Sequence, residues 1–530
     1  MAGSPHLDQA AQDDAHLQSL GIKPELQRTL GFLSNFAVAF SYISVSTGTF
    51  TLMGLGLGVG GPPMFWSWPL VVMGQLFVAL NFAELSSHFP VAGSIYQWSK
   101  RLSNRTLGWF TGWLYFWAGV LTTTAVAITV PLVLSTILGV NGSDMYGPFN
   151  WNVWVALATL VVTTLINAFG IRLLSLINNL GVAAEILGML VFAGILLIFF
   201  NHQPVSVLTN TFGTEANANG NYLAVFAVAA FMSLFVVYGF DTAGTFGEET
   251  VNASRHAPRG VLTAILLSGA IGTVFLLAIL LSTPDMAAAI DSASKGGFPI
   301  ADTIHANLGD VWGNIYLGVV ALAVFVCTLA IQGATTRLMF SMGRDRRLPG
   351  GRFWGKVSAT HKTPTNAAIA VGVLAAIPFL VSNSAGVIAI GATGTIYLSY
   401  FLCNLGVFMA RSKGWPHKKA WFNLGGAGLL INIVALVYGA LMLVNFALWH
   451  NDAFGDWGNA LRDLTNPTLN TLTFLGSAPL TGLPAWPLFE VTIAVLVIAG
   501  ILVYGLGERL QRAAGGEVEA DAATGEATIA

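Results

Sequence analysis

Two acidic residues, Glu185 and Asp241, lie inside long apolar stretches of the sequence. A carboxylate deep in a membrane costs roughly 2.5–3.5 kcal/mol on insertion scales, so such residues usually mark the path of an ion or a substrate. Glu185 could carry a proton or draw a cation into a site. The alternatives are structural: Asp241 would accept bonds from unwound backbone N–H groups, and Glu185 would bind the first membrane helix.

Two of the apolar stretches are interrupted. Both interruptions combine glycine with hydroxyl or carboxylate groups, namely Ser46, Thr47 and Gly48 in the first stretch and Gly239, Asp241 and Gly244 in the sixth. Transporters built from two inverted repeats break the first helix of each repeat near the bilayer midplane. The spacing therefore predicts a substrate site between two broken helices. Glycine used only for close helix packing is the alternative.

The apolar stretches themselves predict the fold class. Hydrophobic residues make up 55% of the 530 residues and charged residues only 9%, whereas a soluble domain carries about 25% charged residues. A membrane helix needs about 20 mainly apolar residues. We expect an all-α polytopic membrane protein with twelve transmembrane helices, near residues 30–57, 64–87, 107–138, 151–170, 175–200, 222–246, 260–283, 312–341, 366–382, 385–410, 424–448 and 488–507.

The distribution of basic residues predicts the topology. If the N-terminus is cytoplasmic, the outside loops hold only Lys295 and Arg462 of the 23 Lys and Arg residues, and Arg337 lies in helix eight. This asymmetry follows the positive-inside rule and places both termini in the cytoplasm of a multi-pass cell-membrane protein. The predicted units are a tail at 1–28, a first repeat at 29–200, a second repeat at 222–411, helices eleven and twelve at 424–507, and a disordered tail at 508–530.

Other classes of function lack their motifs. The sequence has no H-E-x-x-H pair, G-x-S-x-G elbow or Cys/His cluster, and Cys327 and Cys403 lie in apolar runs. The glycines at 56, 58 and 61 spell G-x-G-x-x-G, but they follow a membrane helix and not a strand. Filter motifs of a channel are also missing. We therefore expect no enzyme, no metal, no cofactor and no nucleic-acid partner.

Four ordered segments resemble the amino acid–polyamine–organocation superfamily. They are STGTF at 46–50, similar to a GTGIF break in helix one; AELSSHFPVAGSIYQWSKRL at 83–102; YGFDTAGTFGEETVNASRHAPRGV at 238–261; and TRLMFSMGRDRRLP followed by KTPTNA at 362–367. The segments at 20–41 and 60–85 look most like the amino acid/choline permease branch, which includes 4-aminobutyrate carriers. The chain is identified as a member of that superfamily.

The resemblance implies a leucine-transporter-like fold with broken helices one and six, and transport by alternating access. Backbone N–H groups of the first break would bind a substrate carboxylate at Ser46, Thr47, Gly48 and Thr49. The second break would offer backbone carbonyls to a substrate amine around Phe235, Tyr238, Gly239, Phe240 and Asp241. Its aromatic side chains would either contact the substrate with their rings or serve only for packing. The expected substrate is an amino acid or a small amine such as 4-aminobutyrate, with choline or polyamine transport, exchange and substrate sensing as alternatives.

The same resemblance bears on coupling and gating. In the cationic amino acid branch a lysine occupies the position of Glu185, so this chain reverses the charge there; the expected coupling ion is H⁺, with Na⁺ as the alternative. Three acids at the cytoplasmic side, Glu84, Glu248 and Glu249, would form gating ion pairs with the nearby basic residues Lys100, Arg101, Arg255 and Arg337. The alternative is that they are surface charges near lipid headgroups.

Overall fold

A computed structural model of the chain describes residues 5–382, 384–447, 473–474, 478–479 and 486–513. The first half holds the helices α1 (Pro5–Ser19), α2 (Phe32–Ile43), α3 (Val45–Gly60), α4 (Ser67–His88), α5 (Ser94–Leu102), α6 (Arg105–Ala127), α7 (Thr129–Leu138), α8 (Trp151–Phe169) and α9 (Ile171–Phe199). Short 3₁₀ turns precede or link helices at Pro62–Trp66, Val205–Thr209 and Thr214–Ala218.

The second half holds α10 (Tyr222–Ala229), α11 (Phe231–Val236), α12 (Thr242–Thr245), α13 (Ala253–Ser282), α14 (Met286–Ser294), α15 (Pro299–Arg344), α16 (Gly351–Trp354), α17 (Thr365–Ala376), α18 (Ala385–Arg411), α19 (Gly428–Ala447) and α21 (Leu488–Ala513), with 3₁₀ turns at Gly247–Glu249, Ile377–Leu380 and Gly425–Ala427. Two small antiparallel hairpins pair β1 (Met145–Tyr146) with β2 (Phe149–Asn150) and β3 (Thr473–Phe474) with β4 (Ala478–Pro479). Residues 508–513 continue α21, so the predicted tail at 508–530 starts too early, and its remainder lies outside the described residues.

The helices confirm a polytopic helical membrane protein. Ten of them in the described part are long and apolar enough to cross a bilayer, and each coincides with a predicted span. The other two predicted spans differ: the sixth is interrupted after Val236, and the ninth corresponds to the shorter apolar segment Thr365–Leu380. The count of twelve spans and the repeat of five plus five helices therefore stay predictions.

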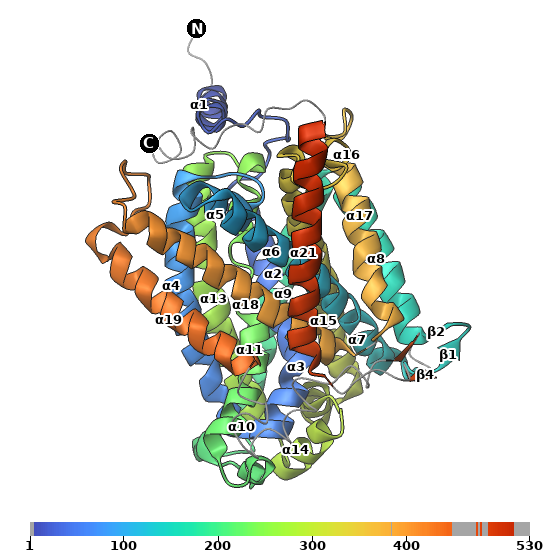
Figure 1. Cartoon of the computed structure of the whole chain (residues 1–530). Helices are drawn as coiled ribbons and strands as arrows, with labels where there is room; N and C mark the ends of the chain where they lie inside the picture. The colour runs from blue at the N-terminus through green and yellow to red at the C-terminus, as the bar shows by residue number, and fades with distance from the viewer. Residues whose placement is uncertain (1–4, 383, 448–472, 475–477, 480–485, 514–530) are drawn as a thin grey trace.

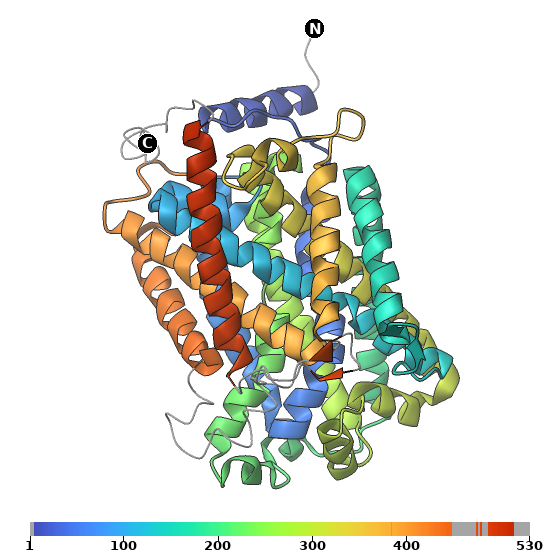
Figure 2. The ribbon, with the colours of Figure 1, turned by 45° about the vertical axis from the view of Figure 1, so that its right-hand side comes forward.

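Long helices cross in the middle of the molecule, and α19 and α21 lie outside. Helix α6 packs against α18 and α15, while α13 packs against α4 and α2. Helices α8 and α17 lie side by side along one flank (Figures 1 and 2). The surface of α19 and α21 carries large exposed apolar side chains such as Leu430 and Leu502, as expected for helices that face lipid.

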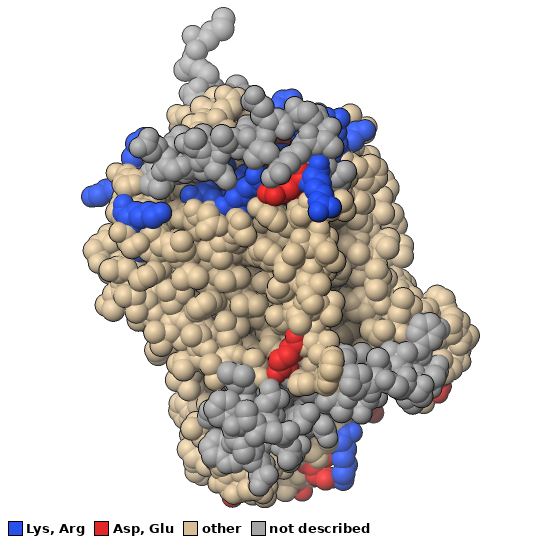
Figure 3. Space-filling view, viewed as in Figure 1, with Lys and Arg blue, Asp and Glu red and all other residues tan. Residues whose placement is uncertain are grey.

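The charged side chains gather at the ends of the molecule. In Figure 3 most of the visible Lys and Arg atoms form a band at one end, and the broad middle zone is almost free of them. Helix α1 lies across that same end, where α21 also terminates (Figures 1 and 2). This arrangement agrees with the asymmetry of basic residues in the sequence, because most of the visible basic side chains lie at one end, beside a wide apolar zone.

Candidate functional site

The first helix break lies at Ser44. There α2 ends and α3 begins, and Ser44 has φ 29° and ψ 92°, outside the helical range. Its backbone N–H donates to Phe40 O at 2.8 Å, and its hydroxyl accepts the Thr47 N–H at 3.3 Å. The break is thus slightly earlier than the sequence indicated, because Ser44 caps α3 and the predicted residues at 46–49 form its first turn.

Glu185 binds the N-terminal end of α3. Its Oε1 accepts a hydrogen bond from the Ser44 hydroxyl at 2.8 Å and another from the Ser46 N–H at 3.1 Å, and the residue is 2% exposed. A carboxylate is favourable at this position because the first N–H groups of a helix lack partners within the helix and carry partial positive charge. The structural bond to the first helix is therefore present, and one of its donors, the Ser46 N–H, is a group that we had expected to serve a substrate.

The rest of the first turn of α3 packs tightly. The Thr49 hydroxyl donates to Val45 O at 2.7 Å, within its own helix. At Gly48 an added Cβ would lie 2.3 Å from Val236 Cγ2, on the last residue of α11. A side chain at position 48 would therefore push α3 away from α11. This close approach brings the two breaks together, as expected for a shared site.

The second break begins after Val236. Residues 237–241 connect α11 to the short helix α12, and Gly239 has φ 90°, in the left-handed region that favours glycine. A Cβ there would lie 2.0 Å from the Tyr42 ring, so the first helix covers this turn directly. The Gly239 N–H donates to the Tyr400 hydroxyl at 2.9 Å. The interruption lies where the sequence indicated, although Gly244 is inside α12.

Asp241 is fully buried and accepts hydrogen bonds from three hydroxyl groups. Tyr115 of α6 donates to Oδ2 at 2.5 Å and Ser94 of α5 donates to the same oxygen at 3.0 Å. Tyr400 of α18 donates to Oδ1 at 2.5 Å. In the described part of the chain, no Lys, Arg or His forms an ion pair with this carboxylate. The carboxylate is thus satisfied by neutral donors alone, which bind an anion without cancelling its charge.

The aromatic residues of the second break divide into two groups. Tyr238 meets Tyr42 and Phe235 edge-on, with ring centroids 6.1 and 6.0 Å away, and its hydroxyl lies 3.3 Å from that of Thr122. Phe240 contacts other rings, those of Tyr400 and Phe82, with centroids 5.6 and 6.1 Å away. Tyr238 therefore contacts the end of α2 beside the first break and Phe235 packs on Tyr238, whereas the contacts of Phe240 are those of a packing residue.

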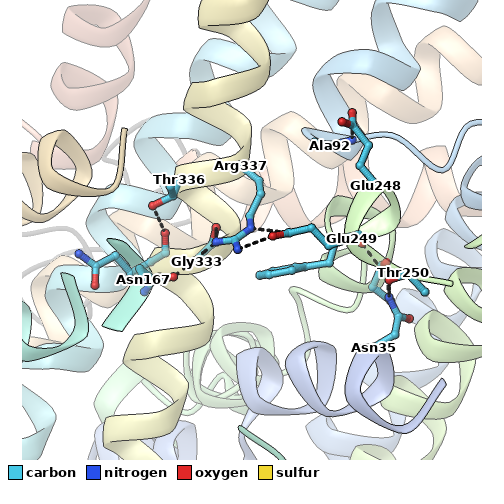
Figure 4. A network of polar contacts seen from close by, with 12 residues as sticks. Asn35, Ala92, Asn167, Glu248, Glu249, Thr250, Gly333, Thr336 and Arg337 are labelled. Atoms are coloured by element: carbon cyan, nitrogen blue, oxygen red, sulfur yellow. Dashed lines mark hydrogen bonds and ion pairs between the residues drawn. The ribbon is translucent and has the colours of Figure 1, made fainter. Parts of the chain in front are cut away.

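A buried ion pair lies beyond the second break. Arg337 of α15 donates Nε to Glu249 Oε2 at 2.8 Å and Nη2 to Glu249 Oε1 at 2.9 Å, and neither side chain is exposed (Figure 4). Its Nη1 donates to Gly333 O at 3.1 Å and lies 3.4 Å from Asn167 Oδ1. The guanidinium also lies 4.2 Å from the centroid of the Phe246 ring. Arg337 thus has the partner that an intramembrane cation requires.

Two further acids at this end have cationic partners. Glu248 receives two bonds of 2.8 Å from Arg344 and one of 2.9 Å from the Ala92 N–H. Glu84 pairs with Arg411 and accepts the Leu424 N–H at 2.9 Å. These pairs join segments far apart in the sequence.

The other predicted basic partners bind elsewhere. Lys100 pairs with Asp345 at 3.0 Å, and Arg101 donates to Leu20 O at 3.0 Å. Burial alone would raise the pKa of Asp345, but the charges of Lys100 and Arg344 outweigh it and hold that pKa below its ordinary value. The predicted pairing of the acids with Lys100, Arg101 and Arg255 is therefore wrong, because α15 supplies the cations for Glu248 and Glu249, and the end of α18 supplies the cation for Glu84.

Helix α1 lies across the end of the molecule that holds these ion pairs (Figures 1 and 2). Asp13 accepts the Asn252 N–H at 2.8 Å, and His16 Nε2 lies 3.2 Å from His88 O. Asp14 pairs with Arg28 at 2.7 Å. These contacts tie the segment before the first break to the ends of α4 and α13, so the end of the molecule that carries the basic residues is closed.

The sequence matches the family described as "Amino acid permease" over residues 30–476, which is most of the chain. The chain belongs to this family. It is 30% identical over 459 residues to the amino-acid permease BAT1 homolog of Oryza sativa subsp. japonica, covering 82% of this chain and 87% of that protein. The amino-acid permease BAT1 of Arabidopsis thaliana is 29% identical, with the same coverage of 82% and 87%. The GABA-specific permease of Saccharomyces cerevisiae is 24% identical, covering 68% of this chain and 65% of that protein.

Four residues of this permease that bind the two acids were missed by the sequence analysis: Ser44, Ser94, Tyr115 and Tyr400. Ser44 had a local signal, because serine is a preferred N-cap and Thr47 follows three positions later. The tyrosines and Ser94 had none. Their only signal was general, since a buried carboxylate needs hydrogen-bond donors.

Proposed function

We propose that this permease is a secondary transporter for amino acids or related small amines such as 4-aminobutyrate, and that it works by proton-coupled alternating access. The observation that carries the proposal is the carboxylate of Glu185, which binds the Ser44 hydroxyl and the Ser46 N–H at the start of α3, beside the second break. The relatives named as amino-acid permeases and as a GABA-specific permease support this substrate class.

The contacts of Glu185 give a physical route to proton coupling. A substrate carboxylate at the start of α3 needs the donors that now bind Glu185 Oε1, namely the Ser44 hydroxyl and the Ser46 N–H. Two carboxylates at one helix terminus repel each other, and a proton on Glu185 removes the repulsion. Substrate and proton therefore favour each other's binding, and by linkage the effect is reciprocal.

The amine of the substrate would bind on the other side of the site. The unwound segment 237–241 presents carbonyl groups there, and Tyr238 and Phe235 supply ring faces near it. Asp241 lies behind this segment on Tyr115 and Tyr400. In this arrangement the carboxylate adds negative potential to the amine side of the site, opposite the N–H groups of α3.

Alternating access would require the closed end to open. The pairs Glu249–Arg337 and Glu248–Arg344 link the exit of the second break to α15, and α1 binds the Asn252 N–H, just after these acids in the chain, through Asp13. Release of substrate on this side requires these pairs to separate, and we assign this side to the cytoplasm of the cell membrane, with both termini inside. The transition is one between two discrete sets of contacts.

A carrier of choline or a polyamine is the second candidate. It is favoured by the three rings of Tyr42, Phe235 and Tyr238 and by Asp241, which has no cationic partner among the described ion pairs. A quaternary ammonium binds well to ring faces. Such a substrate would not need the α3 donors, so Glu185 would keep its bonds and proton coupling through it would be absent.

The test is transport by the full-length chain in proteoliposomes. We expect 4-aminobutyrate or an α-amino acid to accumulate above equilibrium when the lumen is alkaline, and a protonophore should abolish this accumulation. Accumulation driven by a Na⁺ gradient alone would overturn the proton assignment. Choline or putrescine uptake without amino acid uptake would favour the second candidate. Counterflow without net accumulation identifies an exchanger, and binding without any flux identifies a sensor.

A further inference from the structure

Two arginines at the start of α13 stack on aromatic rings. The guanidinium carbons of Arg255 and Arg259 lie 5.6 and 5.9 Å from the centroid of the Trp421 ring. Arg259 also lies 5.2 Å from the Phe32 ring. The cluster thus joins three segments: the start of α2, the first turns of α13 and the loop before α19. We call these four residues the Arg–Trp cluster.

The Arg–Trp cluster has no acidic counterpart in the described chain. The acids near this end pair with other cations, namely Glu248 with Arg344 and Glu249 with Arg337. Asp13, which accepts the Asn252 N–H beside α13, lies 3.9 Å from Arg28. Neither Arg255 nor Arg259 forms an ion pair among the described residues.

The position of Arg255 in the first turn of α13 is electrostatically unfavourable by itself, and Arg259 follows one turn later. The first turn of α13 contains no acidic residue. The N-terminal end of a helix carries partial positive charge, so cations there are destabilising unless an anion is present. Two guanidinium groups beside one indole, one helical turn apart, form a site that an oxyanion would complete.

The surface of α13 indicates which anion this is. Arg255, Arg259, Leu266 and Ala270 are all exposed, and their spacing of four, seven and four residues places them on one face of the helix. Leu266 is 53% exposed. The arginines therefore lie at the head of a stripe that becomes apolar toward the middle of the membrane span. A ligand that follows this stripe needs a charged head and an apolar tail.

We propose that the Arg–Trp cluster binds the phosphate of an anionic phospholipid such as phosphatidylglycerol, with the acyl chain along the exposed stripe of α13. Guanidinium groups bind phosphate oxygens through two parallel N–H bonds, and stacking on an indole leaves these edges free. Basic pockets at the cytoplasmic ends of membrane helices bind such headgroups. This inference does not depend on the substrate or on the coupling ion.

Native mass spectrometry of the full-length chain tests the site. The protein would be titrated with phosphatidylglycerol and with phosphatidylcholine, and thermal melting would be followed in parallel. We expect at least one phosphatidylglycerol to remain bound, and Arg255→Gln/Arg259→Gln to weaken this binding about tenfold or more. The matched control is Arg352→Gln/Lys356→Gln, two exposed cations with the same spacing of four residues, which should retain it.

Two further variants keep the test decisive. Arg255→Lys/Arg259→Lys keeps the charge but loses the paired N–H geometry, so we expect intermediate binding; Trp421→Leu keeps both arginines but removes the ring beneath them, and it should also bind less. The proposal is overturned if the control pair weakens binding as much as the Arg255/Arg259 pair does, or if Trp421→Leu has no effect, because either result describes a generally basic surface. Displacement of the lipid by an equal concentration of inorganic phosphate would also overturn it.

Discussion

The two helix breaks each have a buried carboxylate bound by hydrogen-bond donors, but the carboxylate and its donors come from opposite sides. At the first break, the start of α3 presents the Ser44 hydroxyl and the Ser46 N–H, and a carboxylate from another helix, Glu185, binds both. At the second break the carboxylate, Asp241, belongs to the break itself, and hydroxyls from three other helices bind it. One break thus presents donors to an anion, and the other holds an anion near its carbonyls.

This difference gives the site a polarity. A substrate with a carboxylate and an amine would align along it, with the carboxylate at α3 and the amine at 237–241. The two acids also differ in what a proton would change. A proton on Glu185 frees helix donors for an anion, whereas Asp241 is bound by neutral hydroxyls that do not compete for a substrate. We therefore expect coupling to reside mainly at the first break.

The largest expected effect is that of Gly48→Leu. An added Cβ already lies 2.3 Å from Val236 Cγ2, so a leucine would separate the two breaks. We expect uptake in proteoliposomes to be abolished while the protein remains in the membrane. Normal uptake by this variant would show that transport does not require the contact between the two breaks.

A compensating pair serves as the control for this steric argument. Gly48→Ala should lower uptake strongly, and Gly48→Ala/Val236→Ala should recover a large part of it, because the smaller residue at 236 makes room for the new methyl group. If the pair transports no better than the single variant, the loss has a cause other than the clash.

Glu185→Gln should separate coupling from binding. The amide keeps the size of the side chain but cannot carry a proton, so we expect accumulation driven by a pH gradient to fall about tenfold or more while solute counterflow falls much less. Flux would be measured with and without the gradient, and Asp310→Asn, an exposed acid, is the control. Equal losses in both assays would refute a coupling role for Glu185.

Glu249→Gln should affect stability more than Glu185→Gln does. Removal of one partner of a buried ion pair costs about 3–5 kcal/mol, because the other charge stays buried. Arg337 would keep its bonds to Gly333 and Asn167 and one acceptor, the amide oxygen at position 249, but it would lose the charged carboxylate that binds it through two oxygens. We expect a clear drop in melting temperature and a shift toward the open cytoplasmic side, which accessibility labelling would detect. Glu249→Gln/Arg337→Gln should recover part of the stability, and no recovery would contradict the pairing.

Much of the fold was predictable, since apolar length decides where a membrane helix lies. Ten predicted spans coincide with helices of sufficient length. The second break was also predictable, because Gly239 adopts φ 90° and only glycine does so at little cost. The first break was displaced by a short distance, because the conformation of Ser44 depends on its side-chain bonds to Thr47 and Glu185.

The partners of the acids were less predictable. Glu249 and Arg337 were expected near one another, but the pairing of Glu248 with Arg344 depends on where α15 ends. Tyr115 and Tyr400 reach Asp241 from helices far away in the sequence. No local pattern distinguishes them from other membrane tyrosines, because their role arises only from how α6 and α18 cross.

The smallest expected effect compares these two tyrosines. Tyr400 donates to Asp241 and accepts the Gly239 N–H, whereas Tyr115 donates to Asp241 alone. A hydrogen bond to a charged group contributes about 1.5–3 kcal/mol. We expect Tyr400→Phe to lower uptake about tenfold and Tyr115→Phe to lower it less, because only Tyr400 also holds the unwound backbone.

Tyr397→Phe is the control for both tyrosine variants, since it lies one helical turn earlier on α18 and its hydroxyl faces Tyr438 at 3.3 Å. It should leave uptake nearly unchanged. If Tyr115→Phe impaired uptake as much as Tyr400→Phe, the charge of Asp241 would matter more than the geometry of the second break. The two breaks would then both act through their carboxylates, and the contrast between a donor break and an acceptor break would no longer explain transport.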